Sequence, residues 1–260
     1  MRRRTVEIDL NADVGESFGA YALGKDEDLL GLVSSANIAC GFHAGDPVVM
    51  GRTVTLALRG GAALGAHPGY PDLQGFGRRS LALGEDEVYA AVLYQIGALR
   101  AFAQAAGADL RHVKPHGALY NDAARNPALA RGVARAAKAA GGDLILMGLP
   151  GCELEAAAAD AGLGYAREFF ADRAYQDDGS LVPRNRPDAV IHDEALCVAR
   201  VLRAIREGVV VSASGRTIPV RADTVCLHGD NPEAVAFARR LREALEAAGV
   251  AVRPARAGGR

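Results

Sequence analysis

Short apolar runs alternate with longer segments of helical period along most of this chain, and that alternation restricts its fold more than any other feature. Helices that separate successive strands favour a parallel sheet. The sequence therefore predicts an α/β fold whose sheet is either closed as a barrel or open and doubly wound. The seven runs predicted to be buried strands are Val6–Leu10, Ser35–Cys40, Ala62–Ala66, His112–Lys114, Leu144–Met147, Tyr165–Phe169 and Val225–Leu227.

The segments between these runs include three with the apolar stripe of an amphipathic helix. The stripes cover 88–102, 196–205 and 235–245, and each is followed within a few residues by a glycine, as is common at helix ends. No Gly/Ser-rich or Pro-rich linker divides the chain, so we expect one domain over 1–260. Residues 209–221 are expected to form a hairpin insertion, and the last residues, RPARAGGR, a frayed C-terminal tail.

The composition is that of a compact protein, since 50% of the 260 residues are hydrophobic and 23% are charged. The net charge is -1, whereas a general nucleic-acid binder is expected to be basic. After the Arg2–Arg4 run, Glu7 and Asp9 interrupt any apolar signal core, and no later apolar stretch is long enough to span a bilayer. We therefore expect a cytoplasmic protein that binds neither nucleic acid nor membrane, and the sequence leaves a homo-oligomer open.

The usual nucleotide-binding motifs are missing from the sequence. The first predicted strand runs into NADVGES rather than GxGxxG, and no GxxxxGK[ST] phosphate loop occurs anywhere. We therefore expect that the chain does not hold ATP or NAD by itself through a motif of this kind.

Four of the six histidines lie just beyond a predicted strand: His43, His67, His116 and His228. Asp13 follows the first strand in the same way. Because the carboxyl ends of parallel strands meet at one face of such a fold, these side chains are expected to converge there. Imidazole and carboxylate groups bind divalent metal ions and also exchange protons near neutral pH. The pattern thus predicts a metal site or a cluster of general acids and bases.

Each of these residues also has a structural explanation when taken alone. A histidine at a strand end often does no more than hydrogen-bond the backbone. Asp46 precedes Pro47, and this pair is typical of a helix start with a capping side chain. Only the number of such groups at one predicted face favours a site.

Charged residues that could bind a substrate lie near the same strand ends. The glycine-rich loop GYPDLQGFGRR ends in Arg78 and Arg79, whose guanidinium groups can grip a carboxylate or phosphate, unless they are simply solvated. Lys114, two residues before His116, adds a point charge. Glu168 in the sixth strand and Asp230 after His228 are further predicted substrate contacts.

Five motifs together closely resemble those of the LamB/YcsF family. They are IDLNADVGESFGAYALG, NIACGFHAGDP, GAHPGYPDLQGFGRR, VKPHGALYN and CLHGDNPEAV, and the likeness covers nearly the whole chain. The resemblance implies an irregular seven-stranded β/α barrel related to metal-dependent sugar deacetylases. It also implies an ATP-dependent 5-oxoprolinase activity, in which the lactam of 5-oxoproline is hydrolysed to L-glutamate while ATP yields ADP and phosphate, with separate B and C subunits.

The resemblance further implies roles for individual residues. By similarity to the deacetylase relatives, Asp13, His43 and His116 are expected to bind a divalent metal. Asp13, His67, Lys114 and His228 are the expected catalytic groups, and the expected substrate contacts are Asp46, Arg78, Arg79, Glu168 and Asp230. Two other functions remain open at this point: a stand-alone metal-dependent N-deacetylase, which the absence of tryptophan to stack on sugar rings disfavours, and a non-catalytic lactam-binding subunit.

Overall fold

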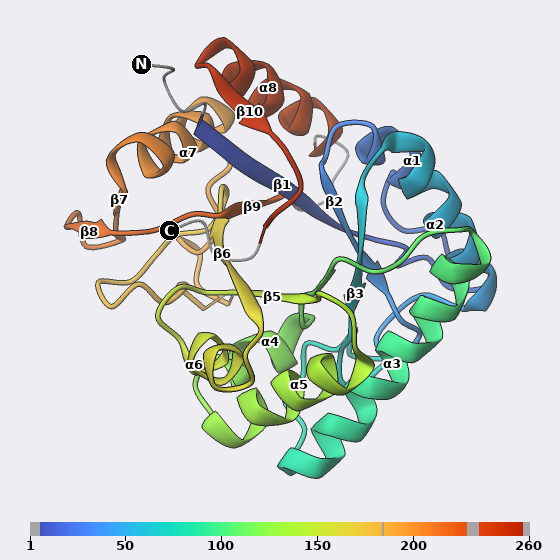
Figure 1. Ribbon diagram of the computed structural model, residues 1–260. Helices are drawn as coiled ribbons and strands as arrows, with labels where there is room; N and C mark the ends of the chain where they lie inside the picture. The colour runs from blue at the N-terminus through green and yellow to red at the C-terminus, as the bar shows by residue number, and fades with distance from the viewer. Residues whose placement is uncertain (1–5, 184, 228–233, 257–260) are drawn as a thin grey trace.

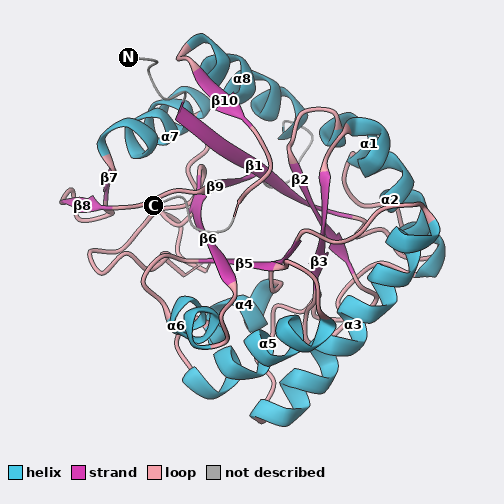
Figure 2. Ribbon diagram, viewed as in Figure 1, coloured by secondary structure: helices cyan, strands magenta, loops and turns pink. Residues whose placement is uncertain are grey.

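Seven parallel strands close into a barrel with helices around it in the computed structural model, which describes residues 6–183, 185–227 and 234–256 (Figures 1 and 2). The strand order is β1-β2-β3-β4-β5-β6-β9, and β9 pairs back to β1. The predicted fold class is confirmed. Of the two arrangements that the alternation of strands and helices allowed, a closed barrel or an open sheet, the chain adopts the barrel. The strands are β1 (Val6–Val14), β2 (Ser35–Ala39), β3 (Ala63–His67), β4 (His112–Val113), β5 (Ile145–Gly148), β6 (Gly164–Phe170) and β9 (Thr224–Leu227).

Helices follow most of the barrel strands and cover the outside of the barrel (Figure 2). The predicted apolar stripes on α3 and α8 are buried against the barrel or neighbouring helices because their apolar residues recur on one face. The stripe predicted over 196–205 on α7 is wrong: Leu196 is exposed, and the buried residues are Cys197, Val201 and Ala204. The helices are α1 (Asp26–Leu30), α2 (Pro47–Gly60), α3 (Glu85–Ala105), α4 (Gly117–Ala123), α5 (Pro127–Ala140), α6 (Glu153–Asp160), α7 (Glu194–Glu207) and α8 (Ala234–Ala247).

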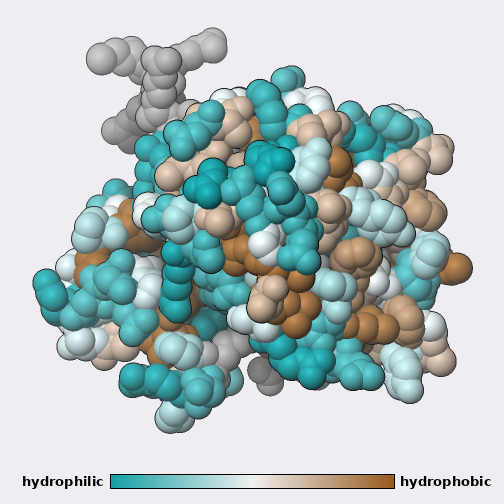
Figure 3. Space-filling view, turned by 90° about the horizontal axis from the view of Figure 1, so that it is seen from below, coloured by the Kyte–Doolittle hydropathy of each residue, from teal (hydrophilic) through white to brown (hydrophobic). Residues whose placement is uncertain are grey.

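Two small features complete the described chain. The predicted hairpin is formed by β7 (Val209–Val211) and β8 (Thr217–Pro219), which pair antiparallel outside the barrel sheet. β10 (Val250–Val252) pairs with the beginning of β1 at the edge of the barrel. On the face shown in Figure 3, hydrophilic residues are interspersed with smaller hydrophobic patches. None of the helices described is both long and apolar enough to cross a membrane.

The inside of the barrel is polar, which is unusual for a packed core. Along β1, Asp9, Asn11 and Asp13 alternate with Leu10 and Ala12, so the polar set shares one face of the strand. That face points inward, because Asn11 hydrogen-bonds Glu168 and Thr224 on other strands. The apolar set packs outward under the helices. The fold therefore directs one row of polar side chains from β1 into the barrel.

Candidate active site

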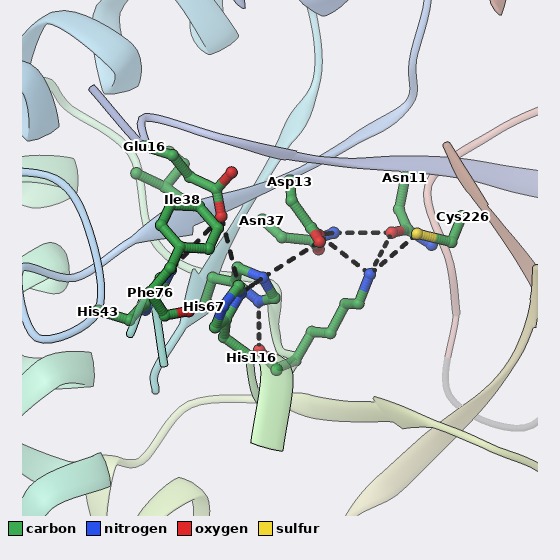
Figure 4. Close-up of polar contacts among 12 residues, drawn as sticks. Asn11, Asp13, Glu16, Asn37, Ile38, His43, His67, Phe76, His116 and Cys226 are labelled. Atoms are coloured by element: carbon green, nitrogen blue, oxygen red, sulfur yellow. Dashed lines mark hydrogen bonds and ion pairs between the residues drawn. The ribbon is translucent and has the colours of Figure 1, made fainter. Parts of the chain in front are cut away.

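Four of the five predicted strand-end residues, Asp13, His43, His67 and His116, meet at the carboxyl ends of the barrel strands (Figure 4). Asp13 is near the end of β1 and His67 is the last residue of β3. His43 follows β2 in the loop that leads to α2, and His116 immediately precedes α4. Parallel register places all four at one end of the barrel, as the sequence predicted for them.

Backbone carbonyls fix the orientation of two of the histidines. His67 Nδ1 donates to the carbonyl of Lys114 at 2.7 Å, and His116 Nε2 donates to the carbonyl of Phe76 at 2.8 Å. A carbonyl accepts only, so these nitrogens carry the ring protons. The remaining nitrogens, His67 Nε2 and His116 Nδ1, therefore face each other with lone pairs at 3.1 Å. That arrangement is favourable only when an added proton or a metal ion lies between them.

His43 and Glu16 complete this cluster. The rings of His43 and His116 stack with centroids 3.7 Å apart, and neither ring nitrogen of His43 has a hydrogen-bond partner among the described residues. Glu16 Oε1 lies 3.5 Å from His43 Nε2 and 3.7 Å from His116 Nδ1. Burial, and then the neighbouring histidines, lower the pKa of both His43 and His116 far below its ordinary value. Both rings are therefore neutral and have lone pairs available.

This donor set fits a divalent metal ion. Glu16, His43, His67 and His116 each offer one ligand atom, and these atoms all lie within 4.8 Å of one another. Neutral imidazoles with one carboxylate are typical ligands of zinc and related ions. The converging lone pairs and the unpartnered nitrogens of buried His43 are what a bound cation would satisfy.

Asp13 lies between this histidine cluster and a buried lysine. Its Oδ2 is 3.3 Å from His67 Nε2, and its Oδ1 is 3.0 Å from Lys114 Nζ. Asp13 is therefore beside the four-residue donor set rather than within it. The sequence-based assignments of Asp13 as a metal ligand and as a catalytic group both stay predictions.

Lys114 is held as a cation inside the barrel. Its Nζ lies 2.7 Å from Glu168 Oε1 and 3.1 Å from Asn11 Oδ1, in addition to its contact with Asp13. Burial by itself would lower the pKa of Lys114, but the surrounding Asp13, Cys226 and Glu168 outweigh it and raise that pKa well above its ordinary value. Lys114 can therefore stabilise negative charge but does not serve as a base at neutral pH.

A cavity of about 370 Å³ opens above these groups. Asp13, His67, Lys114 and His116 contribute to its lining, together with Glu16 and Arg78. Most of the remaining walls come from α4, the end of β6 and the segments that follow them, and they combine polar and apolar groups. They include Tyr120, Asn121, Arg125, Phe170, Arg173, Leu181, Val182 and Pro183. The cavity suits a small ligand that has both an anionic and an apolar part.

Comparison with known proteins agrees with the resemblance found in the motifs. The model of the family described as LamB/YcsF matches residues 8–259, almost the whole length. The chain belongs to the LamB/YcsF family. A relative from Methylococcus capsulatus, named as the A subunit of 5-oxoprolinase, is 58% identical over 94% of each chain. One of the same name from Brevibacillus brevis is 52% identical over 94% of this chain and 96% of its own length.

A solved structure supports the fold of this LamB/YcsF chain. The lactam utilization protein from Thermus thermophilus superposes with a TM-score of 0.91 at 52% identity, over 95% of this chain and 99% of that one. A putative cellobiose-phosphate cleavage protein from Enterococcus faecalis shares the fold with a TM-score of 0.58, at 14% identity over 95% of this chain and 97% of that one.

The other predicted site residues of this LamB/YcsF chain lie in different surroundings. Arg78 lines the cavity, whereas Arg79 is 63% exposed and forms an ion pair with Asp72 of its own loop. The Asp46 side chain caps α2 by accepting from the N–H groups of residues 48 and 49, which is the structural alternative considered for it. Glu168 is fully buried against Lys114. Substrate contact by these four residues stays a prediction, and His228 and Asp230 lie outside the described residues.

The structure adds residues that the sequence prediction did not include. Glu16 and Tyr120 lie within the NADVGES and VKPHGALYN segments, but neither follows a strand directly. Asn37 in β2 donates to both Asn11 and Asp13, and so orients the base of the site. The signal for Glu16 was its position three residues beyond Asp13 in a motif already recognised as part of the LamB/YcsF pattern.

Proposed function

We propose that this chain is the A subunit of an ATP-dependent 5-oxoprolinase and hydrolyses the lactam of 5-oxo-L-proline to L-glutamate. The observation that carries the proposal is the placement of Asp13 between His67 and Lys114 in a cavity sized for a small anionic ligand. Relatives at 52% and 58% identity, both named as the A subunit of 5-oxoprolinase, support it.

The chemistry begins with an unreactive amide. ATP activates the lactam oxygen by phosphorylation, which yields ADP and makes the ring carbon electrophilic. Water then adds to that carbon while Asp13 takes its proton, as a general base within reach of the cavity. The C–N bond breaks as the ring nitrogen takes up a proton, and a second water releases phosphate from the resulting acyl phosphate.

The chain's own cations and histidines support these steps. Lys114 stabilises the negative charge that develops near Asp13, because the two are only 3.0 Å apart. His67 Nε2 has a lone pair 3.3 Å from Asp13 Oδ2, and in the metal-free chain it accepts the proton that Asp13 takes from water. Arg78 binds the carboxylate of the lactam or the phosphoryl group. We assign Arg79, Asp46, Glu168 and Asp230 to substrate binding and His228 to catalysis as further expectations.

A divalent metal is part of the proposal. Glu16, His43, His67 and His116 would hold it, and Asp13 would lie at its edge. When bound, such an ion polarises a substrate oxygen or lowers the pKa of a water.

ATP and partner proteins complete the proposal. Because no phosphate loop occurs in the sequence, the ATP-binding groups are assigned mainly to B and C subunits that assemble with this chain. We place the complex in the cytoplasm.

The test is ATP-dependent release of glutamate from 5-oxoproline by the purified chain, with and without candidate B and C subunits. The complete mixture is expected to release glutamate, ADP and phosphate. Asp13→Asn is expected to lower this rate by about 1000-fold. The control is Asp28→Asn, which changes an exposed carboxylate on α1. No glutamate from the complete mixture would defeat the proposal, and full activity of Asp13→Asn would favour a non-catalytic binding subunit.

The metal-competent cluster supports one alternative, a stand-alone metal-dependent N-deacetylase. This enzyme would share the cavity but need no ATP. Release of acetate from a chromogenic N-acetyl substrate, abolished by a chelator and restored by zinc, would favour it. Absence of that activity under conditions that yield glutamate would eliminate it.

A further inference from the structure

His112 in β4 is a fully buried histidine inside the barrel, and it does not line the cavity. Its Nε2 lies 2.7 Å from Oδ1 of Asn37, whereas its Nδ1 has no hydrogen-bond partner among the described residues. The ring lies against the backbone of Gly65, where a Cβ atom would be only 1.9 Å from Nε2. A buried nitrogen without a partner costs stability. An apolar side chain would avoid that cost, so the imidazole needs an explanation other than packing.

Lys114 fixes the direction of the hydrogen bonds that lead from His112 to Asp13. Because an ammonium group only donates, the atom of Asn11 that lies 3.1 Å from Lys114 Nζ is the amide oxygen. Asn37 Nδ2 donates to that oxygen at 2.7 Å and to Asp13 Oδ1 at 2.9 Å (Figure 4). The other end of the Asn37 amide is then its oxygen, which needs a donor. The ring proton of His112 is therefore on Nε2.

These bonds distinguish the two carboxylate oxygens of Asp13. Oδ1 accepts from both Asn37 Nδ2 and Lys114 Nζ, whereas Oδ2 lies 3.3 Å from His67 Nε2. Two donors on Oδ1 disfavour a proton there, so a proton taken from water is directed to Oδ2, beside His67. If the Asn37 amide turned over, its oxygen would face Oδ1 and would favour a proton on that atom instead.

We propose that His112 is a positioning residue: by donating to Asn37, it holds the amide in the orientation that directs the proton taken up by Asp13 to Oδ2. This inference rests on the proposed lactam hydrolysis, in which Asp13 is the general base. It adds a residue that acts through Asn37 rather than on the substrate. Burial, and then the nearby Lys114, lower the pKa of His112 to about 3, so the ring stays neutral at the pH of the assay.

The test compares two substitutions of His112 in the complete enzyme with its partner subunits. His112→Leu removes the donor, and kcat for glutamate release is expected to fall by about 100-fold. KM should stay within a factor of about three, because His112 does not line the cavity. In His112→Gln the amide N–H is as many bonds from Cβ as Nε2 is in histidine, so kcat should stay within about fivefold of the wild type.

Tyr165→Phe is the matched control for loss of a buried hydrogen bond. Its hydroxyl donates to the carbonyl of Leu149 at 2.9 Å and does not line the cavity. The melting temperature of this variant should fall while kcat stays unchanged.

A second measurement tests the hydrogen bond itself in the wild-type chain. Nitrogen-15 NMR of histidine-labelled protein is expected to show neutral His112 with its proton on Nε2, and the signal is identified by its absence from a His112 variant. A proton on Nδ1 would mean that the Asn37 amide is turned the other way, and this result would overturn the inference.

Two kinetic results would also overturn the inference while the proposed function stands. One is wild-type kcat in His112→Leu. The other is an equal loss of kcat in His112→Leu and His112→Gln, which would leave the histidine a structural role only. If the wild-type mixture releases no glutamate at all, the proposed function fails and this inference fails with it, even where NMR finds the proton on Nε2.

Discussion

The barrel interior and the loops around it both contain charged residues that the sequence marks as site candidates, but the two regions treat them differently. Inside, Lys114 contacts Asp13, Asn11 and Glu168, which come from strands far apart in the chain. In the loops, Arg79 pairs with Asp72 only seven residues away, and Asp46 caps the helix that follows it. Interior groups are desolvated and depend on one another, whereas Arg79 and Asp46 in the loops keep contact with water.

The difference shows where removal of a charged side chain changes the free energy of unfolding. A buried charge that loses its partner stays buried and uncompensated, so removing one member of an interior group is costly. An exposed pair is screened by solvent and contributes little. Substitutions in the two regions should therefore have effects of different size, and five of them test the comparison.

The largest effect is expected for Lys114→Met. The substitution leaves Asp13 and Glu168 without their shared cation, since Lys114 lies within 3.0 Å of each. We expect the free energy of unfolding to fall by about 3–5 kcal/mol and turnover to be lost. Urea denaturation followed by circular dichroism measures the first. Lys138→Met on the exposed face of α5 is the control, and equal stability of the two variants would contradict the comparison.

Asp9→Asn tests the deepest interior carboxyl. Burial raises the pKa of Asp9 to about 6 from its ordinary value of 3.8, although Ser34, Thr224 and Ser35 donate hydrogen bonds to it. The folded protein therefore holds this proton more tightly than the unfolded chain. The resulting stability is complete below about pH 4 and is lost as the pH rises through about 6.

The difference from the ordinary value corresponds to about 3 kcal/mol. Relative to Asp9→Asn, wild-type unfolding free energy should fall by about this amount between pH 4 and pH 8. Urea titrations of both proteins across that range measure it. Parallel pH profiles would show that Asp9 does not titrate as its burial requires.

His116→Ala tests the histidine cluster at the cavity. Loss of one of four donor groups should weaken binding of cobalt(II), used as a spectroscopic stand-in for zinc, by more than about 100-fold. The measurement is the visible absorption of the cobalt protein during titration. His192→Ala removes an exposed histidine outside the cluster and should bind as the wild type does. Equal binding by His116→Ala would remove the metal from the proposal.

A smaller effect is expected for Asp46→Ala in the surrounding loops. The substitution removes the side-chain cap of α2 and the bond to the N–H of Gly19. The melting temperature should fall by about 3 °C. Asp46→Asn keeps one accepting oxygen and should therefore retain most of the wild-type melting temperature. A large rise in KM for 5-oxoproline in both variants would instead support the predicted substrate contact.

The smallest effect on stability is expected for Arg79→Ala. Arg79 is 63% exposed, and its buried partner Asp72 keeps the N–H of Gly75 as a donor when Arg79 is removed, so the melting temperature should stay within about 2 °C of the wild type. Calorimetric binding of 5-oxoproline then decides the predicted role of Arg79 in substrate binding. Weaker binding at unchanged stability would support that role, and unchanged binding would restrict it to Arg78.

Much of the site could be predicted because it depends on local sequence and parallel register. Asp13, His43, His67 and His116 each lie at or near a strand end, and parallel strands bring such ends to one face whatever the details of closure. Glu16 was missed because it lies in a short irregular segment after β1, and the sequence does not show the path of that segment. Tyr120 was missed because its place in the cavity wall depends on how α4 packs against the barrel.

By itself, the sequence determined the alternation of strands and helices, the helix start at Pro47, and the face to which the strand-end groups belong. The tertiary structure decided that the sheet closes by pairing β9 with β1, and so which polar groups meet across the interior. Asn11 reaches Glu168, 157 residues away, only because of that closure. The physical reason is that hydrogen bonds and lone pairs act over a few ångströms, and distances across a barrel follow from its closure rather than from sequence spacing.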